Sequence, residues 1–220
     1  MIKPVKYPRT PHLPWSPGAT NDDRMLKDVS HYKGKQIVVS LKMDGENTTL
    51  YNEFLHARSI DSADHPARHW MKGFWAQKRR FIPEGWRVCG ENLYAKHSIH
   101  YDDLESYFLV FSIWDGDICL PYWKTRTLCD EWGLAHVPPM YNGFWLEPED
   151  NSGMNMETFL GRRFENMYLG HEGYVIRTYD EFRFEDFEIN VAKYVRENHV
   201  QTDDHWMHTK LIPNKLYTSS

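Results

Sequence analysis

The alternation of apolar and polar residues along the chain predicts many short strands. Runs of about four to eight residues that are rich in β-branched and aromatic side chains are typical of strands. Such runs occupy residues 36–42, 47–52, 55–59, 86–94, 107–114, 117–120, 173–178 and 189–196. The dipeptides Asp44-Gly45 and Asp115-Gly116 predict tight turns, and the first of them makes 47–52 the return strand after 36–42.

Other segments carry the periodicity or the end signals of helices. Between residues 66 and 81 the large apolar side chains recur at helical spacing among basic residues, which predicts a basic amphipathic helix. A second helix is expected over residues 121–132, with Gly133 as its stop. Residues 156–164 are expected to form a short helix, and the segment from Thr202 onward to form another.

The order of these elements indicates one main domain with two short appendages. Five prolines among residues 1–24 predict an extended N-terminal segment, because proline removes an amide donor and restricts the backbone. Residues 25–200 would form the domain, and residues 201–220 a short helical tail. Residues 137–153 are rich in Pro, Gly and Asn and read as a loop. Mostly antiparallel strands with interspersed helices predict an α+β fold.

Composition narrows the class of protein. The chain has 220 residues, of which 41% are hydrophobic and 26% charged, as in ordinary globular domains. No apolar run approaches the roughly 20 residues that a membrane-spanning helix needs, and we expect no signal peptide. Three unpatterned cysteines exclude a disulfide scaffold and favour a reducing compartment. We therefore expect a cytoplasmic protein, or one in the host cytoplasm if its source is viral.

Charge is distributed unevenly along the chain. The formal net charge is −5, which argues against binding nucleic acid through overall charge. Residues 65–87 nevertheless carry six Lys and Arg side chains against the single acid Glu84. Such a polarised segment can present a basic face to phosphates, although a solvated helix face is the plainer interpretation. The basic residues are Arg68, Lys72, Lys78, Arg79, Arg80 and Arg87.

The sharpest local feature is Lys42-Met43-Asp44-Gly45-Glu46-Asn47, a lysine at a strand end followed by a tight turn. With a reference pKa near 10.4, only about 0.04% of a lysine side chain is neutral at pH 7. A nucleophilic lysine therefore needs nearby positive charge or a metal ion, which disfavours its ammonium form. By itself the string also fits an exposed lysine before a hairpin turn.

Four further strings follow in a fixed order. They are Gly90-Glu91-Asn92-Leu93-Tyr94, the run from Phe108 to Asp115, Glu172-Gly173-Tyr174-Val175-Ile176-Arg177 and Val191-Ala192-Lys193-Tyr194-Val195-Arg196. Together with the lysine string they resemble motifs I, III, IIIa, IV and V of the covalent nucleotidyltransferases, which include ATP-dependent ligases and capping guanylyltransferases. Within that superfamily the chain is most similar to RNA ligases of the RNA ligase 2 type and their small phage relatives. The resemblance spans residues 36–196 and implies an α+β, ATP-grasp-like adenylation domain of antiparallel sheets with flanking helices and no OB domain.

The resemblance implies three catalytic side chains. Lys42 would take AMP from ATP as a lysyl phosphoramidate, and Glu172 would position a divalent metal. Lys193 would contact the α-phosphate. The family commonly has two motif V lysines separated by one residue, and this chain has only Lys193 there. Either Arg196 substitutes for the second lysine, or the register differs and Lys193 is itself the second.

The resemblance also implies a set of nucleotide contacts. Glu91 matches the acid that holds the ribose, and Phe111 matches the aromatic residue that stacks on adenine. Arg58, within Ala57-Arg58-Ser59, resembles the motif Ia arginine that contacts the nucleotide or the strand with the 3′-hydroxyl. Asn47, five residues after Lys42, matches a position that some RNA ligases use in sealing.

The implied activity is ATP-dependent sealing of RNA in three steps. AMP passes from ATP to the lysine, then to a 5′-phosphate end, and a 3′-hydroxyl attacks that activated end and releases AMP. The implied cofactors are ATP and Mg²⁺, with Mn²⁺ as the alternative metal. The partner would be RNA with 5′-phosphate and 3′-hydroxyl ends, as in RNA repair, and we expect a monomer. Nucleotidyl transfer depends on positioning and charge neutralisation, which this set of residues supplies.

Three other functions stay open from the sequence. One is a DNA ligase-like enzyme, and another is a GTP-dependent capping nucleotidyltransferase, which the absence of an OB domain disfavours. The third is a non-catalytic RNA-binding module that has kept the fold. Retention of Lys42, Glu91, Glu172 and Lys193 argues against the third, because a module without catalysis has no need of all four.

Overall fold

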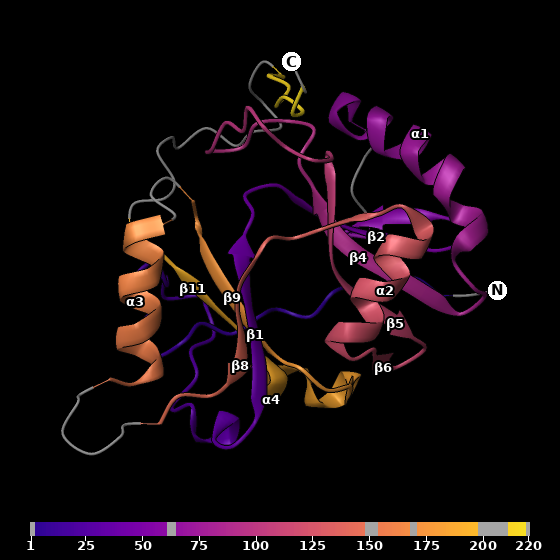
Figure 1. The fold of residues 1–220 in the computed structure, drawn as a ribbon. Coiled ribbons are helices and arrows are strands. Elements are labelled where there is room, and N and C mark those ends of the chain that lie inside the picture. The colour runs from indigo at the N-terminus through magenta and orange to yellow at the C-terminus, as the bar shows by residue number, and fades with distance from the viewer. Residues whose placement is uncertain (1–2, 61–64, 148–153, 168–170, 198–210, 219–220) are drawn as a thin grey trace. The chain divides into compact units, whose positions relative to one another are not determined.

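A computed structural model describes residues 3–60, 65–147, 154–167, 171–197 and 211–218. The chain divides into two compact units, each with its own sheet. The first unit comprises residues 1–8, 44–137 and 200–220, and the second comprises residues 9–43 and 138–199. Both sheets are mainly antiparallel and carry helices, which confirms the expected α+β class (Figure 1). The expected domain limits at residues 24 and 200 stay a prediction.

None of the helices in the described ranges is long and apolar enough to cross a membrane.

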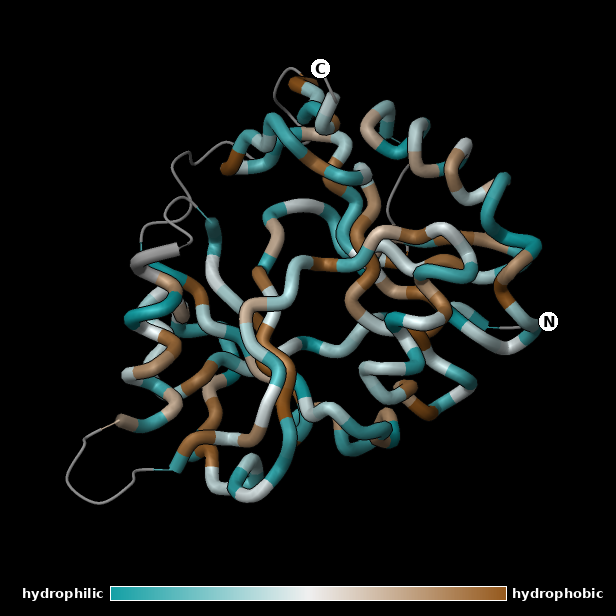
Figure 2. The backbone as a smooth tube through the Cα atoms, viewed as in Figure 1, coloured by the Kyte–Doolittle hydropathy of each residue, from teal (hydrophilic) through white to brown (hydrophobic). Residues whose placement is uncertain are grey.

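The second unit is built on a four-stranded antiparallel sheet with the order β11–β9–β1–β8 (Figure 1). The nearly continuous apolar run of β1 lies in the middle of this sheet, with neighbours on both sides, and is visible in Figure 2. The strands are β1 (Gln36–Lys42), β8 (Pro139–Phe144), β9 (Gly173–Thr178) and β11 (Val191–Val195).

The pairing register around β9 decides which side chains share a face of this sheet. Lys42 of β1 lies opposite Gly173 of β9, and Lys193 of β11 lies opposite Val175. Directly paired residues point to the same face, and so do residues two apart in one strand. Lys42 and Lys193 therefore project from the same face of the sheet.

Helix α3 (Met156–Met167) packs on the opposite face. The rings of Tyr174 and Tyr194, which are paired across β9 and β11, stack with their centroids 4.7 Å apart. Phe164 of α3 contacts both rings edge-on, with centroid distances of 5.6 and 5.7 Å. The remaining short elements of this unit are η1 (Ser30–Tyr32), β10 (Phe182–Arg183), η4 (Phe184–Asp186) and α4 (Phe187–Asn190).

The N-terminal segment lengthens this sheet at its β11 edge. The amide of Leu13 donates to the carbonyl O of Lys193 at 2.8 Å, and the amide of Lys193 donates to the carbonyl O of Pro11 at 2.9 Å. His12 is thereby paired with Lys193 in a parallel bridge, and on its other side it pairs with residues 24–26. His12 and Leu13 lie between two prolines, and their amides are the donors that pair with the neighbouring backbone.

The first unit is built on a second sheet with the order β6–β5–β4–β2–β3, in which β7 lies parallel beside β5. Its two longest strands are buried at most of their positions. They are β2 (Glu46–Leu50), β3 (Leu55–Ala57), β4 (Trp86–Asn92), β5 (Phe108–Asp115), β6 (Ile118–Cys119) and β7 (Ala135–His136).

Two helices supply the rest of the core of the first unit. Helix α1 (His69–Lys78) lies between the short turns η2 (Pro66–Arg68) and η3 (Arg79–Phe81), and α2 (Tyr122–Trp132) ends at Gly133 with φ of 60°. Both helices and the Gly133 stop confirm the sequence prediction. The core residues are Leu50, Met71, Ile82, Val88, Phe108, Val110, Ile113, Leu120, Leu128, Cys129 and Leu134.

The hairpin predicted at Asp44-Gly45 is wrong. Strand β1 pairs with β8 and β9, whereas β2 pairs with β3 and β4. The turn residues are used differently, because the carboxylate of Asp44 accepts hydrogen bonds from the amides of Ser98 and Ile99 at 2.7 and 2.8 Å. The turn is therefore held by another loop of its own unit and does not fold β2 back onto β1.

Two other expectations were partly wrong. The predicted loop 137–153 contains β8, an edge strand whose first residue is Pro139, a position where no amide donor is required. The predicted strand 189–196 begins at Val191, because residues 189–190 belong to α4.

The predicted C-terminal helix is wrong where the structure describes it. Residues 198–210 lie outside the described ranges. Residues 211–218 are not helical, and Pro213 and Leu216 form isolated bridges with Ala95 and Leu104. Pro213 has no amide hydrogen with which to continue a helix.

We expect Gly173→Ala to destabilise the protein by about 1–3 kcal/mol, the usual range for overpacking. A Cβ atom at this position would overlap the carbonyl O of Tyr194 and lie 3.1 Å from the Cα atom of Val195. The measurement is the free energy of unfolding in urea. Gly161→Ala is the matched control, because a Cβ there meets nothing within 4 Å and Gly161 lies inside α3, where alanine favours the helix by up to about 1 kcal/mol. Equal effects of the two variants would contradict this account.

The burial of His12 predicts a loss of stability in mild acid. Burial lowers the pKa of His12 to about 4; the charge of Lys193 and then that of Lys42 act in the same direction, and Asp23 opposes them. Between pH 6.5 and 4, His12 therefore binds a proton in the unfolded chain but not in the folded chain. The free energy of unfolding consequently decreases as the pH is lowered through this range. At pH 5 the expected loss is about 2 kcal/mol relative to pH 8. Urea unfolding of wild type and His12→Gln at both pH values tests this, and an equal pH dependence of the two proteins would disprove it.

Candidate functional site

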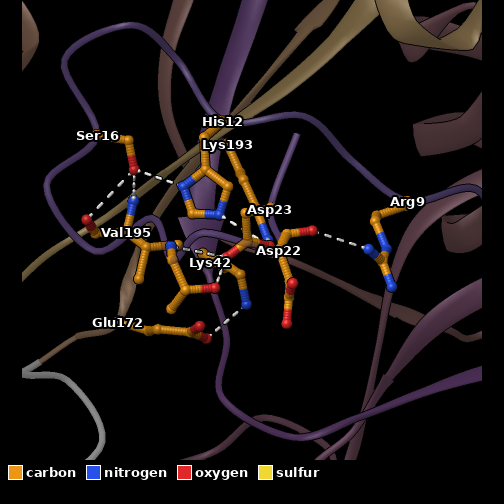
Figure 3. Close-up of polar contacts among 10 residues, drawn as sticks. Arg9, His12, Ser16, Asp22, Asp23, Lys42, Glu172, Lys193 and Val195 are labelled. Carbon is orange, nitrogen blue, oxygen red and sulfur yellow. Dashed lines mark hydrogen bonds and ion pairs between the residues drawn. The ribbon is translucent and has the colours of Figure 1, made fainter. Parts of the chain in front are cut away.

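Lys42 and Glu172 form the centre of a polar cluster in the second unit. Lys42 is the last residue of β1, and Glu172 immediately precedes β9, the neighbouring strand. The Nζ atom of Lys42 lies 2.6 Å from the Oε2 atom of Glu172 (Figure 3). Both side chains are largely buried, with exposed fractions of 24% and 9%. Two residues that the sequence places 130 positions apart thus form a direct ion pair.

Arg196 makes two hydrogen bonds to the backbone carbonyls of Glu172 and its neighbour His171. The amide of Arg196 donates to the carbonyl O of Glu172 at 3.0 Å, and the Nε atom of Arg196 donates to the carbonyl O of His171 at 2.7 Å. Gly173 then allows the backbone of β11 to pass close by. Arg196 therefore anchors the residues that lead into β9.

Lys193 lies on the same face as Lys42 and is paired with an acid that the sequence analysis missed. The Nζ atom of Lys193 is 3.7 Å from the Oδ1 atom of Asp23. The same carboxylate oxygen lies 3.5 Å from the Nε2 atom of His12. Figure 3 shows these three side chains beside the pair of Lys42 and Glu172.

Burial, hydrogen bonds and neighbouring charge set the charge states of His12 and Asp23. The Nδ1 atom of His12 lies 2.8 Å from the hydroxyl of Ser16, and His12 is 1% exposed. Its lowered pKa keeps the imidazole neutral at pH 7. Burial acts to raise the pKa of Asp23, but hydrogen bonds from the amide and hydroxyl of Thr20, together with the charge of Lys193, bring it below its usual value. Asp23 is therefore an anion beside a lysine.

The resemblance implies nucleotide contacts for four residues of the first unit, which are Asn47, Arg58, Glu91 and Phe111. Asn47 of β2 lies directly opposite Glu91 of β4, so their side chains share a face of the sheet. The amide of Arg58 donates to the carbonyl O of Asn47 at 2.9 Å, which places it next to the same pair. The amide of Gly45 donates to the Oε1 atom of Glu91 at 3.2 Å.

Phe111 lies at an irregularity in the pairing of β4 with β5. The register shifts between Cys89 and Gly90, and Phe111 is the extra residue on β5. Its ring is partly exposed and meets the ring of Tyr7 edge-on, with centroids 5.1 Å apart. The bulge explains why this aromatic ring is not buried in the core like its neighbours Val110 and Ser112.

A network from distant parts of the first unit holds the turn after Lys42. The amide of Asp44 donates to the hydroxyl of Tyr101 at 2.9 Å, in addition to the two bonds that its carboxylate accepts. Tyr101 is in turn fixed by Asn214, whose Oδ1 atom accepts from the Tyr101 amide at 3.0 Å. The Nδ2 atom of Asn214 donates to the carbonyl O of Leu93 at 2.8 Å, and Asn214 is 1% exposed.

The basic segment 65–87 is less free to bind phosphate than its sequence indicates. Arg68 is buried and forms an ion pair with Glu46, its Nε atom 2.8 Å from the Oε2 atom. Lys78 donates to the carbonyl O atoms of Trp132 and Gly133 at the end of α2, and buried Arg87 donates to that of Gly116. Lys72, Arg79 and Arg80 are the exposed basic residues of the segment.

The structure thus brings the residues of the sequence prediction together in two groups, one in each unit. The roles assigned to them stay predictions. The signal that could have revealed His12 and Asp23 is weak, because an extended proline-rich segment can pair with any sheet edge. The pairing of this segment with β11 is what identifies Lys193 as the neighbour of His12.

Comparisons with known proteins identify the family of this chain. A protein-family model described as RNA ligase matches residues 35–195. A comparison of the sequence with curated proteins gave no match.

Solved structures of the RNA ligase of Naegleria gruberi share the fold. One mutant, with ATP and Mn, has a TM-score of 0.52 and 16% identity, and the match covers 91% of this chain and 63% of that one. A second mutant with ATP and Mn, and a third with AMP and Mn, each give a TM-score of 0.51, with 16% and 17% identity. Each of these matches covers 79% of this chain and 53% of the other, so this chain spans about half the length of those proteins.

The family model covers most of the chain, from just before β1 to the end of β11, and includes both groups of site residues. The chain belongs to the RNA ligase family.

Proposed function

We propose that this protein is an ATP-dependent RNA ligase that joins 5′-phosphate and 3′-hydroxyl ends of RNA through a lysyl-AMP intermediate. The observation that carries the proposal is the placement of Lys42 and Lys193 on one face of the sheet, with Glu172 bonded to Lys42. Two ammonium groups and a buried carboxylate are suited to a phosphate that is attacked by one of the amines. The RNA ligase 2 type and the phage-like form remain part of the proposal.

In the first step, the Nζ atom of Lys42 would form a bond to the α-phosphorus of ATP. The bond from that phosphorus to the pyrophosphate oxygen breaks, and pyrophosphate leaves. The ammonium group of Lys42 would lose one proton before the attack and a second as the phosphoramidate forms, and both protons would pass to solvent. Lys193, on the same face, would neutralise charge on the α-phosphate as it develops in the transition state. AMP would then pass to the 5′-phosphate of RNA, and attack by the 3′-hydroxyl would release it.

The residues of the first unit are proposed to bind the rest of the nucleotide. Glu91 would accept hydrogen bonds from the ribose, and Phe111 would stack on adenine. Asn47 and Arg58, which lie beside Glu91 in the sheet, would contact the nucleotide or the RNA end. For the phosphate contacts of motif V we favour Lys193 alone, because the Nε atom of Arg196 is engaged by the His171 carbonyl.

Glu172 is a suitable ligand for a divalent metal ion. Mg²⁺ commonly uses one or two protein carboxylates, together with water and substrate phosphates. Glu172 offers a nearly buried carboxylate next to the proposed nucleophile. A bound Mg²⁺ or Mn²⁺ would supply neutralisation of phosphate charge. Glu172 is also the counter-ion of Lys42. The negative charge next to the lysine would therefore be reduced when this carboxylate binds a metal ion.

Arg79 and Arg80 are the best candidates for RNA contacts outside the nucleotide site. Both are exposed, and each guanidinium lies over an aromatic ring, at 4.7 Å from Trp75 and 4.8 Å from Phe81. This packing orders two cations at the end of α1. Paired aromatic and basic side chains are typical of surfaces that bind single-stranded nucleic acid.

The proposed chemistry predicts that the protein becomes covalently labelled. Incubation with Mg²⁺ and ATP labelled at the α-phosphate, followed by denaturation, should leave the label on wild type and none on Lys42→Ala. Lys35→Ala is the matched control, because Lys35 precedes the same strand and is exposed. We expect this variant to be labelled like wild type.

The same assay separates the alternatives. Labelling by GTP and not by ATP would identify a capping-type enzyme, and transfer of AMP to DNA but not RNA ends would identify a DNA ligase-like enzyme. No label with ATP, GTP or NAD⁺, after pyrophosphate has removed any AMP bound during expression, would leave a non-catalytic RNA-binding module.

Reversing the charge of Arg79 and Arg80 to Glu should weaken binding of single-stranded RNA and flatten its dependence on salt. Each lost phosphate contact should lower the slope of log K against log salt concentration by about 0.7. Fluorescence anisotropy of labelled RNA measures both quantities. Lys33→Glu with Lys35→Glu makes the same change of charge at exposed residues of the second unit, and we expect it to leave the slope unchanged. The same slope for the Arg79 and Arg80 variant and wild type would show that this surface does not bind RNA.

A further inference from the structure

The N-terminal segment brings a fixed anion to the face of the sheet that bears the two lysines. Residues 11–13 pair with β11, and residues 24–26 pair back onto His12, so the loop between them closes beside Lys193. Asp23 lies in this loop. Its placement follows from backbone pairing at both ends of the loop, and it does not depend on the chance position of a surface side chain.

The two oxygens of Asp23 have different environments. The Oδ2 atom accepts hydrogen bonds from the amide and the hydroxyl of Thr20, at 3.1 and 2.9 Å, so the loop itself holds it. The Oδ1 atom faces Lys193 at 3.7 Å and His12 at 3.5 Å. Because His12 is buried and neutral at pH 7, Lys193 is the cation that faces Asp23 in the part of the chain that the structure describes.

The face therefore carries two ion pairs of unequal strength. Lys42 and Glu172 are within hydrogen-bond distance at 2.6 Å, and Glu172 is 9% exposed. Lys193 and Asp23 are 3.7 Å apart, and their exposed fractions are 19% and 25%. A longer and more hydrated ion pair is the weaker of the two. A phosphate group that approaches this face would therefore displace Asp23 from Lys193 more readily than it would displace Glu172 from Lys42.

We propose that Asp23 is a built-in counter-ion of Lys193, which holds the lysine on the site face and gives it up to a phosphate group of the nucleotide. The site recognises a polyphosphate, such as the triphosphate of ATP or the pyrophosphate that leaves it. Asp23 competes with these anions for Lys193 and so sets how tightly they bind. This inference rests on the proposed function in taking the anion to be a nucleotide polyphosphate.

Asp22 provides a matched control for charge. It is the neighbouring residue, it carries the same charge, and its side chain is exposed. Asp22→Asn and Asp23→Asn therefore change the net charge equally at adjacent positions. Thr20→Val removes the hydroxyl that holds the Oδ2 atom of Asp23 without changing any charge, and so reports on the structure of the loop.

The experiment measures binding of inorganic pyrophosphate to the whole protein by calorimetry, without metal, and the KM and kcat of labelling by ATP. We expect Asp23→Asn to bind pyrophosphate about fivefold more tightly and to lower the KM for ATP by a similar factor, because a competing anion is gone. Asp22→Asn should differ from wild type by less than about twofold, because an exposed charge is screened.

The outcomes separate this inference from the proposed function. Unchanged or weaker pyrophosphate binding by Asp23→Asn, or an equal gain in Asp22→Asn, would overturn the role of Asp23. Weaker binding by both Asp23→Asn and Thr20→Val would show that Asp23 only maintains the loop, which also overturns it. If Asp23→Asn binds pyrophosphate more tightly while wild type forms no lysyl-AMP, the counter-ion role stands and the ligase proposal fails.

Discussion

The antiparallel register of β9 between β1 and β11 is the constraint on which the site of the second unit depends. Gly173 lies opposite Lys42 on one side and Val195 on the other, and Val175 lies opposite Lys193. A shift of one residue in either pairing would turn a lysine to the opposite face, where α3 packs against Tyr174 and Tyr194. Gly173 permits this register, because a side chain there would collide with the backbone of β11.

Charge balance on this face follows from the same pairing. Among the described residues, Lys42 pairs with Glu172, which precedes β9, and Lys193 pairs with Asp23, which lies in the N-terminal loop. The buried and neutral His12 adds no further cation. Within the described residues, the charge of both lysines on this face is therefore offset by carboxylates, although its function as proposed is to receive a highly charged anion.

Much of the fold and part of the site could be predicted from the sequence, for identifiable physical reasons. β1 and β9 carry continuous apolar runs with clear ends, and Gly133 has the left-handed backbone that stops α2. The prediction of a hairpin at Asp44-Gly45 was wrong because a turn signal is local. The strand with which β2 pairs, β4, lies far away in the sequence. The contact of His12 and Asp23 with Lys193 joins residues at opposite ends of the chain, and no local pattern reports such a pairing.

The contacts of Asn214 and Ser16 have a consequence for the order in which the protein is made. Asn214 holds Tyr101, 113 residues earlier, and Tyr101 holds the turn after Lys42. Ser16 accepts a hydrogen bond from the amide of Val195, 179 residues later. During synthesis, the first network cannot close until Asn214 has emerged from the ribosome, and the second cannot close until Val195 has emerged. Because loop closure over such wide separations carries an entropic cost, the surroundings of the lysine at position 42 depend on residues that are translated long after it.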